Sequence, residues 1–142
     1  MKQGFDDLLG YNIIEIARKV NVLMNKKLEF LDITFPQYRI ISRLWLKGEL
    51  TQKELHEYLS ITPATLTPMI KLLEKKNLIK RKVDMEDARS KKITLTDRGI
   101  EVREKAFGVI MDFEEDKLQT MGPEETQLLI KWLKSVNDNI GL

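Results

Sequence analysis

The sequence predicts a mainly α-helical protein with one small β-hairpin, arranged as a winged helix-turn-helix that is flanked by helices at both ends. Three observations lead to this fold class. Apolar residues recur at helical spacing through most of the chain. Two short helices joined by a tight turn, predicted between residues 51 and 75, form a helix-turn-helix pattern. Two alternating segments, 78–83 and 91–96, follow directly and enclose a polar run, which predicts a hairpin, or wing.

The first helix is predicted from about Asp6 to Leu31. Its apolar residues mostly alternate spacings of four and three: Leu9, Ile13, Ile16, Val20, Leu23, Leu28 and Leu31. Such a near-heptad stripe is long for a small domain. It can pack on its own domain or on a partner chain, and the sequence leaves both open.

Two capping boxes start the next two helices. Thr34 with Gln37 begins the second helix, and Gly48 ends it because glycine is favoured just past a helix C-terminus. Thr51, with an acid three residues later, begins a short third helix that ends near residue 60. Leu50 is expected to lie in a short connection between these two helices.

The fourth helix is the candidate for reading a nucleic acid. Thr62 suits the N-cap and Pro63 the first helical position. The inner apolar face consists of Leu66, Met69, Ile70 and Leu73. The opposite face carries Ala64, Thr67, Pro68, Lys71 and Lys75. Because that face is short and polar and then cationic, it can enter a groove and meet base edges and phosphates.

Pro68 leaves two possible starts for this helix. At the sixth position it deletes a backbone hydrogen bond to the Ala64 carbonyl, so we expect it to bend or loosen the helix. An alternative start, with Thr67 at the N-cap and Pro68 at the first helical position, avoids that loss. The longer helix is favoured because Leu66 belongs to the apolar face.

Positive charge is concentrated in this helix and the hairpin. Residues 61–98 hold ten Lys or Arg and five Asp or Glu, a net charge of +5, whereas the whole chain carries +2. Such segregation is typical of a nucleic-acid binder. The alternative is a winged-helix adaptor that binds protein without direct DNA readout, and a salt-dependent affinity for duplex DNA separates the two.

Two further helices complete the chain. Thr96 caps the fifth, which starts near Asp97 and continues to about Thr120. Gly122-Pro123 starts the sixth, and acids in its first turn suit the helix dipole. Together with the first helix, these two carry more apolar surface than one small winged helix needs, which predicts a dimer interface.

Composition narrows the function classes. The chain has no cysteine, which excludes disulfides, thiolate catalysis and thiol-based redox sensing, and which is compatible with a cytoplasmic location. No apolar run approaches the ~18 residues of a membrane span. The first ten residues lack the pattern of a signal peptide, and no membrane contact is predicted.

No enzyme is predicted. The single histidine, His56, is flanked by charged residues that do not share a helical face well, so it is expected to be solvated rather than catalytic or metal-binding. The acidic run 114–116 is expected to be a solvated face. The sequence has no glycine-rich phosphate loop, and no cofactor or metal is predicted.

Three short motifs follow one another through the hairpin and into the fifth helix: Arg81, Asp87-Ala88-Arg89 and Leu95-Thr96-Asp97-Arg98-Gly99. In this order they resemble the wing signature of MarR-type transcriptional regulators, R, D-x-R and L-T-x-x-G. Residues 33–38 and 65–69 are similar to the branch of that family that senses organic hydroperoxides. The resemblance covers nearly the whole chain and is densest from Ile33 to Gly99.

The resemblance implies a homodimeric repressor or activator, and we expect a repressor. Its terminal helices would form a dimerisation layer, 1–33 and 97–142, and its winged helix-turn-helix domain, 34–96, would bind double-stranded DNA at a pseudo-palindrome. The resemblance also implies that Arg89 reaches the minor groove and that Asp87 helps to hold the wing, roles that suit an Arg–acid pair. The residues expected to bind DNA are Thr62, Ala64, Thr65, Thr67, Pro68, Lys71, Lys75, Arg81, Arg89 and Lys91.

One departure from the hydroperoxide-sensing branch concerns its sensor. That branch carries a reactive cysteine near the start of its first helix, at a position that corresponds to about Gly10, and this chain has no thiol there or elsewhere. A small-molecule effector would therefore bind non-covalently. In this family such ligands sit between the dimer layer and the DNA-binding domain, where Tyr11, Phe30 and Trp45 are candidate linings, although aromatic residues there more often belong to the core.

Overall fold

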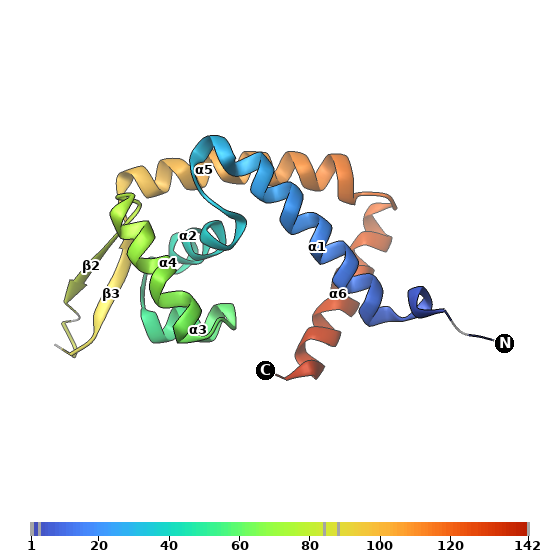
Figure 1. The fold of residues 1–142 in the computed structure, drawn as a ribbon, viewed down its shortest axis with the longest axis horizontal. Coiled ribbons are helices and arrows are strands. Elements are labelled where there is room, and N and C mark those ends of the chain that lie inside the picture. Colours follow the sequence, from blue (N-terminus) through green and yellow to red (C-terminus); the bar gives the residue numbers. More distant parts are fainter. Residues whose placement is uncertain (1, 3, 84, 88, 142) are drawn as a thin grey trace. The chain divides into compact units, whose positions relative to one another are not determined.

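The computed structural model describes residues 2, 4–83, 85–87 and 89–141, and the chain forms two compact units, Met1–Ala106 and Phe107–Leu142. The helices that begin in the first unit are α1 (Leu9–Leu28), α2 (Phe35–Lys47), α3 (Gln52–Leu59), α4 (Pro63–Lys75) and α5 (Asp97–Phe113), which continues into the second unit (Figure 1). Its strands are β1 (Glu49–Thr51), β2 (Ile79–Val83) and β3 (Lys91–Leu95). This mainly α-helical fold with a hairpin wing agrees with the prediction.

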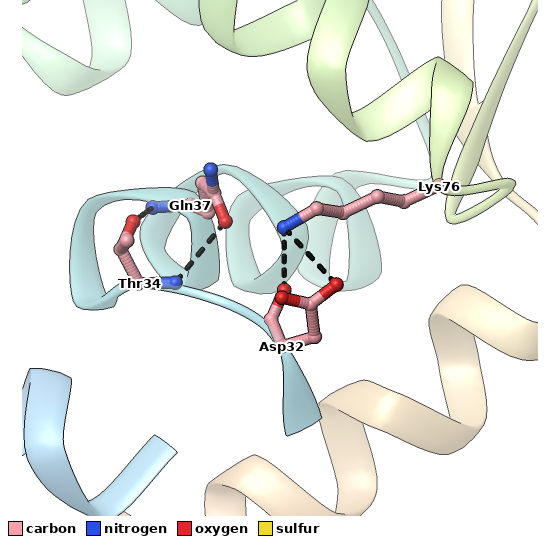
Figure 2. A network of polar contacts seen from close by, with 4 residues as sticks. All are labelled: Asp32, Thr34, Gln37 and Lys76. Carbon is pink, nitrogen blue, oxygen red and sulfur yellow. Dashed lines mark hydrogen bonds and ion pairs between the residues drawn. The ribbon is translucent and has the colours of Figure 1, made fainter. Parts of the chain in front are cut away.

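The predicted capping box of α2 is present, and of the box predicted for α3 the structure has the N-cap half. The Thr34 Oγ1 accepts a hydrogen bond from the Gln37 backbone N–H at 3.2 Å, and the Gln37 Oε1 accepts one from the Thr34 N–H at 3.1 Å (Figure 2). Gly48 ends α2 with a φ of 84°, which glycine adopts without steric cost. The Thr51 Oγ1 accepts from the Glu54 N–H at 3.1 Å and so caps α3.

The start of α4 decides between the two predicted helices. Thr62 is the N-cap, and its Oγ1 accepts from the Thr65 N–H at 3.3 Å. Pro63 is the first helical residue and Pro68 lies inside the helix. The longer helix is therefore correct, and the alternative start at Thr67 is wrong. That Pro68 loosens the helix stays a prediction.

The start of α1 differs from the prediction of one helix from Asp6. A 3₁₀ turn covers Phe5–Asp7, the backbone of Leu8 is extended, and α1 begins at Leu9. The Asn12 side-chain amide donates hydrogen bonds to the carbonyl oxygens of Asp6, at 2.7 Å, and Leu8, at 2.8 Å. This polar cap was missed because apolar spacing says nothing about it.

The sheet has one strand more than the predicted hairpin. Its three antiparallel strands lie in the order β1-β3-β2. In β1, Leu50 pairs with Ile93 of β3, and both side chains are buried. The prediction that Leu50 lies in a plain connection is wrong, because a strand of three residues is too short to show an alternating pattern in the sequence.

The core of the first unit draws on α1, α2, α3 and α4 and on the sheet. Its fully buried side chains include Met24, Leu28, Ile40, Ile41, Leu44, Leu55, Leu66, Ile70, Leu73, Leu78 and Ile93. Met69, which the spacing placed on the inner face of α4, is only half-buried. The inner face of α4 therefore rests on Leu66, Ile70 and Leu73.

The L-T-x-x-G motif fastens the start of α5 to the chain before β2. The Thr96 Oγ1 accepts from the Gly99 N–H at 3.0 Å and donates to the Asn77 carbonyl at 2.7 Å. The Thr96 N–H donates to the Leu78 carbonyl at 3.1 Å. A Cβ on Gly99 would lie 2.1 Å from that same Leu78 oxygen, so this close approach requires glycine.

The second unit consists of the end of α5, a π-helical turn and α6 (Pro123–Ile140). The π-helical turn covers Glu114–Leu118, so the predicted continuation of the fifth helix towards Thr120 is helical but changes type. As predicted, α6 starts after Gly122, whose N–H donates to the Glu125 carboxylate at 3.2 Å. None of the described residues of α6 is buried.

Candidate nucleic-acid interface

The outer face of α4 is open to solvent. Its exposed members among the predicted contact residues are Thr62, Ala64, Thr65, Pro68, Lys71 and Lys75. The Thr62 hydroxyl donates to the Thr65 Oγ1 at 3.1 Å, which orders the first turn. The helix therefore presents small and hydroxyl-bearing side chains near its N-terminus and two lysines further along. The small and hydroxyl-bearing side chains suit contacts with base edges, and the lysines suit contacts with phosphates.

Thr67 differs from its neighbours because it is half-buried against α3. The Nε2 of Gln52, the first residue of α3, donates a hydrogen bond to the Thr67 Oγ1 at 2.7 Å. Helical spacing predicted Thr67 on the outer face and gave no sign of Gln52. Spacing within one helix shows which side chains share a face, and it does not show which side chain of another helix meets them.

Arg81 connects the wing to the end of α4. Its Nε lies 2.8 Å from the Glu74 Oε1, and the two side chains are 26% and 34% exposed. Lys82, the next residue, forms an ion pair with Glu49 of β1. Arg81 was predicted as a DNA contact, and the structure places it where it also holds β2 against α4. The sequence did not predict the ion pair of Glu74, because its partner Arg81 lies on a different element, the strand β2.

Asp87 acts on the backbone of the wing tip. Its Oδ1 accepts from the Arg89 N–H at 3.0 Å, and its carbonyl accepts from the Ser90 N–H at 3.0 Å. Asp87 therefore closes a turn at the wing tip. Its predicted part in holding the wing and in orienting a guanidinium stays a prediction. Ala88 and Asp84 of this loop lie outside the described residues. The side chain of Arg89 is exposed.

An open hollow of about 370 Å³ lies between the wing and the start of α3. It is lined by Thr51, Gln52, Lys53, Arg81, Arg89, Ser90, Lys91 and Ile93. Four of these eight side chains are cationic and none is acidic. This wing hollow brings three predicted contact residues, Arg81, Arg89 and Lys91, to one place. It adds Lys53, which was not among the predicted contacts. Its charge suits a phosphate-bearing partner.

Comparison with known proteins identifies the group of proteins to which these features belong. The MarR family matches residues 33–91. An organic hydroperoxide resistance transcriptional regulator of Bacillus subtilis (strain 168) is 40% identical over 114 residues, which cover 77% of this chain and 78% of that relative. The chain belongs to the MarR family.

Solved structures of MarR-family proteins have the same fold. The S. aureus MepR–DNA complex matches with a TM-score of 0.86 and 27% identity, over 94% of this chain and 98% of that one. A mutant MarR from E. coli complexed with operator DNA matches with a TM-score of 0.85 and 25% identity, over 95% of this chain and 99% of that one. The winged-helix prediction and the predicted family are therefore confirmed, and the family's members are transcriptional regulators rather than enzymes.

His56 has a structural position in this MarR-family chain. Its Nδ1 lies 2.7 Å from the Ile61 carbonyl oxygen, and the Ile61 N–H donates to the His56 carbonyl at 3.3 Å. These two contacts close the turn between α3 and α4. The expectation of a solvated side chain is wrong, because His56 is half-buried and bonded to the backbone directly before the N-cap of α4.

A second polar contact fastens the other end of α4. Lys76, directly after the helix, donates from its Nζ to the Asp32 carbonyl at 2.5 Å and lies 3.7 Å from the Asp32 carboxylate (Figure 2). Asp32 has a left-handed backbone, with a φ of 55°. The connection between α1 and α2 is therefore held against the C-terminal end of α4.

The three aromatic candidates for an effector pocket have different surroundings. Tyr11 packs edge-on against Phe5, with ring centroids 5.1 Å apart. Trp45 lies below the Arg103 guanidinium, 3.7 Å from its ring centroid. Phe30 is 68% exposed. Their predicted part in an effector site stays a prediction.

Among the described residues, no group of three or more His, Cys, Asp or Glu side chains could hold a metal ion. None of the helices found there is long and apolar enough to cross a membrane.

Proposed function

We propose that this MarR-family protein is a sequence-specific transcriptional repressor that acts as a homodimer on a pseudo-palindromic operator. The observation that carries the proposal is the cationic wing hollow next to the exposed face of α4. In this arrangement α4 enters the major groove, and Arg89 reaches from the wing into the minor groove, where a narrow groove attracts arginine. MepR and MarR, which share the fold, have been solved with DNA.

The contacts to DNA are assigned to two groups of residues. The α4 group, which meets base edges and adjacent phosphates, is Thr62, Ala64, Thr65, Thr67, Pro68, Lys71 and Lys75. The wing group is Arg81, Arg89 and Lys91, with Asp87 holding the turn. Arg81 also pairs with Glu74, so its substitution affects the placement of the wing as well as the charge.

The dimer is assigned to the helices outside the winged domain, with residues 1–33 and 97–142 as the dimerisation layer and 34–96 as the DNA-binding domain. Large apolar side chains are exposed on α1 and on α6, among them Leu9, Ile16, Leu23, Leu128, Leu129, Trp132 and Leu133. A chain that leaves so many exposed needs a partner surface to bury them. Sedimentation at micromolar concentration measures the dimer directly, and a monomer that bound a palindrome tightly would contradict this assignment.

We assign the control of DNA binding to a small molecule that binds non-covalently. We also propose that the protein is cytoplasmic. The relative named as an organic hydroperoxide resistance transcriptional regulator is 40% identical, yet these 142 residues contain no cysteine. Oxidation of a thiolate, the first step of cysteine redox sensing, therefore has no starting group in this chain.

The test is selection of bound sequences from random duplexes. A recovered palindrome with half-sites about 10 base pairs apart supports both DNA readout and two-fold symmetry. Lys75→Gln should weaken binding to the recovered DNA. Lys134 is an exposed lysine of α6, and Lys134→Gln should leave DNA binding unchanged. Failure to enrich any sequence, together with a DNA affinity that does not fall with salt, would favour a protein-binding adaptor instead.

A further inference from the structure

The contact between Gln52 and Thr67 fixes the direction of a hydrogen bond on the face that would read DNA. The Gln52 Nε2 is 2.7 Å from the Thr67 Oγ1, and both residues are half-buried. A threonine hydroxyl has one proton to donate and two lone pairs that accept. Because an amide N–H can only donate, the contact occupies a lone pair of Thr67 and leaves its proton unused.

The helix itself does not take up that proton. A threonine inside a helix can donate to the carbonyl four residues earlier, which here is that of Pro63. Within the described part of the chain, the bond from Gln52 is the one hydrogen bond that the Thr67 side chain makes. The proton can therefore point out of the protein, next to the exposed Ala64 and Lys71.

We propose that Gln52 is a specificity-determining residue, which orients the Thr67 hydroxyl as a donor so that α4 selects a base that presents an acceptor. This rests on the proposed function. In the major groove guanine offers the acceptors O6 and N7, and thymine offers O4. Adenine offers the acceptor N7 beside its N6 amino donor, whereas cytosine offers only the N4 amino group as a donor. At the base that faces Thr67, the operator should therefore favour guanine or thymine over cytosine, with adenine, which has both kinds of group, between them.

Gln52→Glu reverses the direction of this bond. A carboxylate can only accept, so the Thr67 hydroxyl must donate to it and can then offer only lone pairs to the DNA. The favoured base should change to one with an amino group, cytosine or adenine. Gln52→Leu neither donates nor accepts, so it should leave the two classes of base nearly equal.

The experiment compares the sequences that each full-length variant selects from random duplexes, followed by affinities for operators that differ at the one base. The parent should prefer guanine or thymine over cytosine by roughly two- to tenfold, the range that one net hydrogen bond supplies. Lys53→Gln is the matched control, because Lys53 is an exposed neighbour of Gln52 and both substitutions make the net charge of the protein more negative by one unit. It should bind all operators more weakly and keep the parent's base preference.

Thr67→Val keeps the shape of the side chain without the hydroxyl, and it tests the inference even if Gln52→Glu does not fold. It should lose the preference at the same base, and Gln52→Leu should have no further effect on it. The inference is overturned if the parent selects an operator and Gln52→Glu keeps the parent's preference, or if Thr67→Val does. If the parent protein selects no DNA sequence, both the proposed function and this inference fail.

Discussion

Gly99→Ala is expected to destabilise the first unit, although the same change inside a helix normally stabilises. The Cβ of alanine would lie 2.1 Å from the Leu78 carbonyl oxygen and 3.1 Å from its carbon. Both are backbone atoms and cannot rotate away. Either the first turn of α5 or the chain before β2 must move, which strains the hydrogen bonds that Thr96 makes to the Leu78 and Asn77 carbonyls.

The magnitude follows from three terms. Forcing an extra carbon into a closed site costs about 1–3 kcal/mol. Loss of the two Thr96 hydrogen bonds costs about 1 kcal/mol each. The better helix propensity of alanine returns about 1 kcal/mol. The sum is a destabilisation of about 2–4 kcal/mol.

Urea unfolding monitored by circular dichroism measures the free energy of unfolding. Gly108→Ala is the matched control in the same helix, because no described residue beyond the adjacent turns of that helix has an atom within 4 Å of its Cβ position. It should raise the free energy of unfolding by up to about 1 kcal/mol. A Gly99→Ala variant as stable as the parent would show that α5 does not approach Leu78 as closely as described.

Four further outcomes are expected. Arg89→Ala should weaken operator binding by ~1–3 kcal/mol, the scale of a specific arginine contact, and equal affinity would refute its place in the minor groove. Lys75→Ala should weaken binding to all sequences and make the salt dependence shallower by ~0.9 per subunit if it meets one phosphate. Glu74→Gln should lower operator affinity, because it weakens the contact that places Arg81 and the wing. It should change the free energy of unfolding by no more than ~1 kcal/mol, because glutamine keeps the shape of the side chain and a partly exposed ion pair stabilises little; a large loss of stability would contradict a positioning role. Brief treatment with organic hydroperoxide should leave DNA binding intact in a mobility-shift assay, since these residues include no cysteine; rapid release that dithiothreitol reverses would require a thiol-bearing partner.

The features that the sequence predicted correctly are local ones. The caps at Thr34, Thr51 and Thr62 each join residues three apart, so their partners are fixed by the helix itself. The stop at Gly48 and the length of α4 follow from the same kind of local rule. The buried face of α4 was also predictable, because Leu66, Ile70 and Leu73 repeat with the period of a helix.

The features that were missed depend on the meeting of separate elements. β1 is a strand only because Leu50 lies beside Ile93, more than forty residues later. The contacts of Gln52 with Thr67 and of Glu74 with Arg81 have no periodicity that a single segment could show. The bond from the Arg89 N–H to Asp87 was missed for another reason: a short acid next to a tight turn can bond to the nearest backbone N–H, which a motif of side chains does not show.

These missed contacts share a physical role, which is to fix the rotation of α4. Apolar packing holds a helix against its neighbours, but it is not directional, so a small rotation about the helix axis costs little. Hydrogen bonds and ion pairs are directional and resist such a rotation. In this chain they act along the whole length of α4: His56 at the preceding turn, Gln52 in the middle, and Glu74 and Lys76 at the end. Base readout depends on side chains whose positions are fixed before the protein binds. Polar contacts hold α4 to α3, to the wing and to the α1–α2 connection. Such a helix is suited to discriminate between DNA sequences, whereas its lysines alone would only bind DNA.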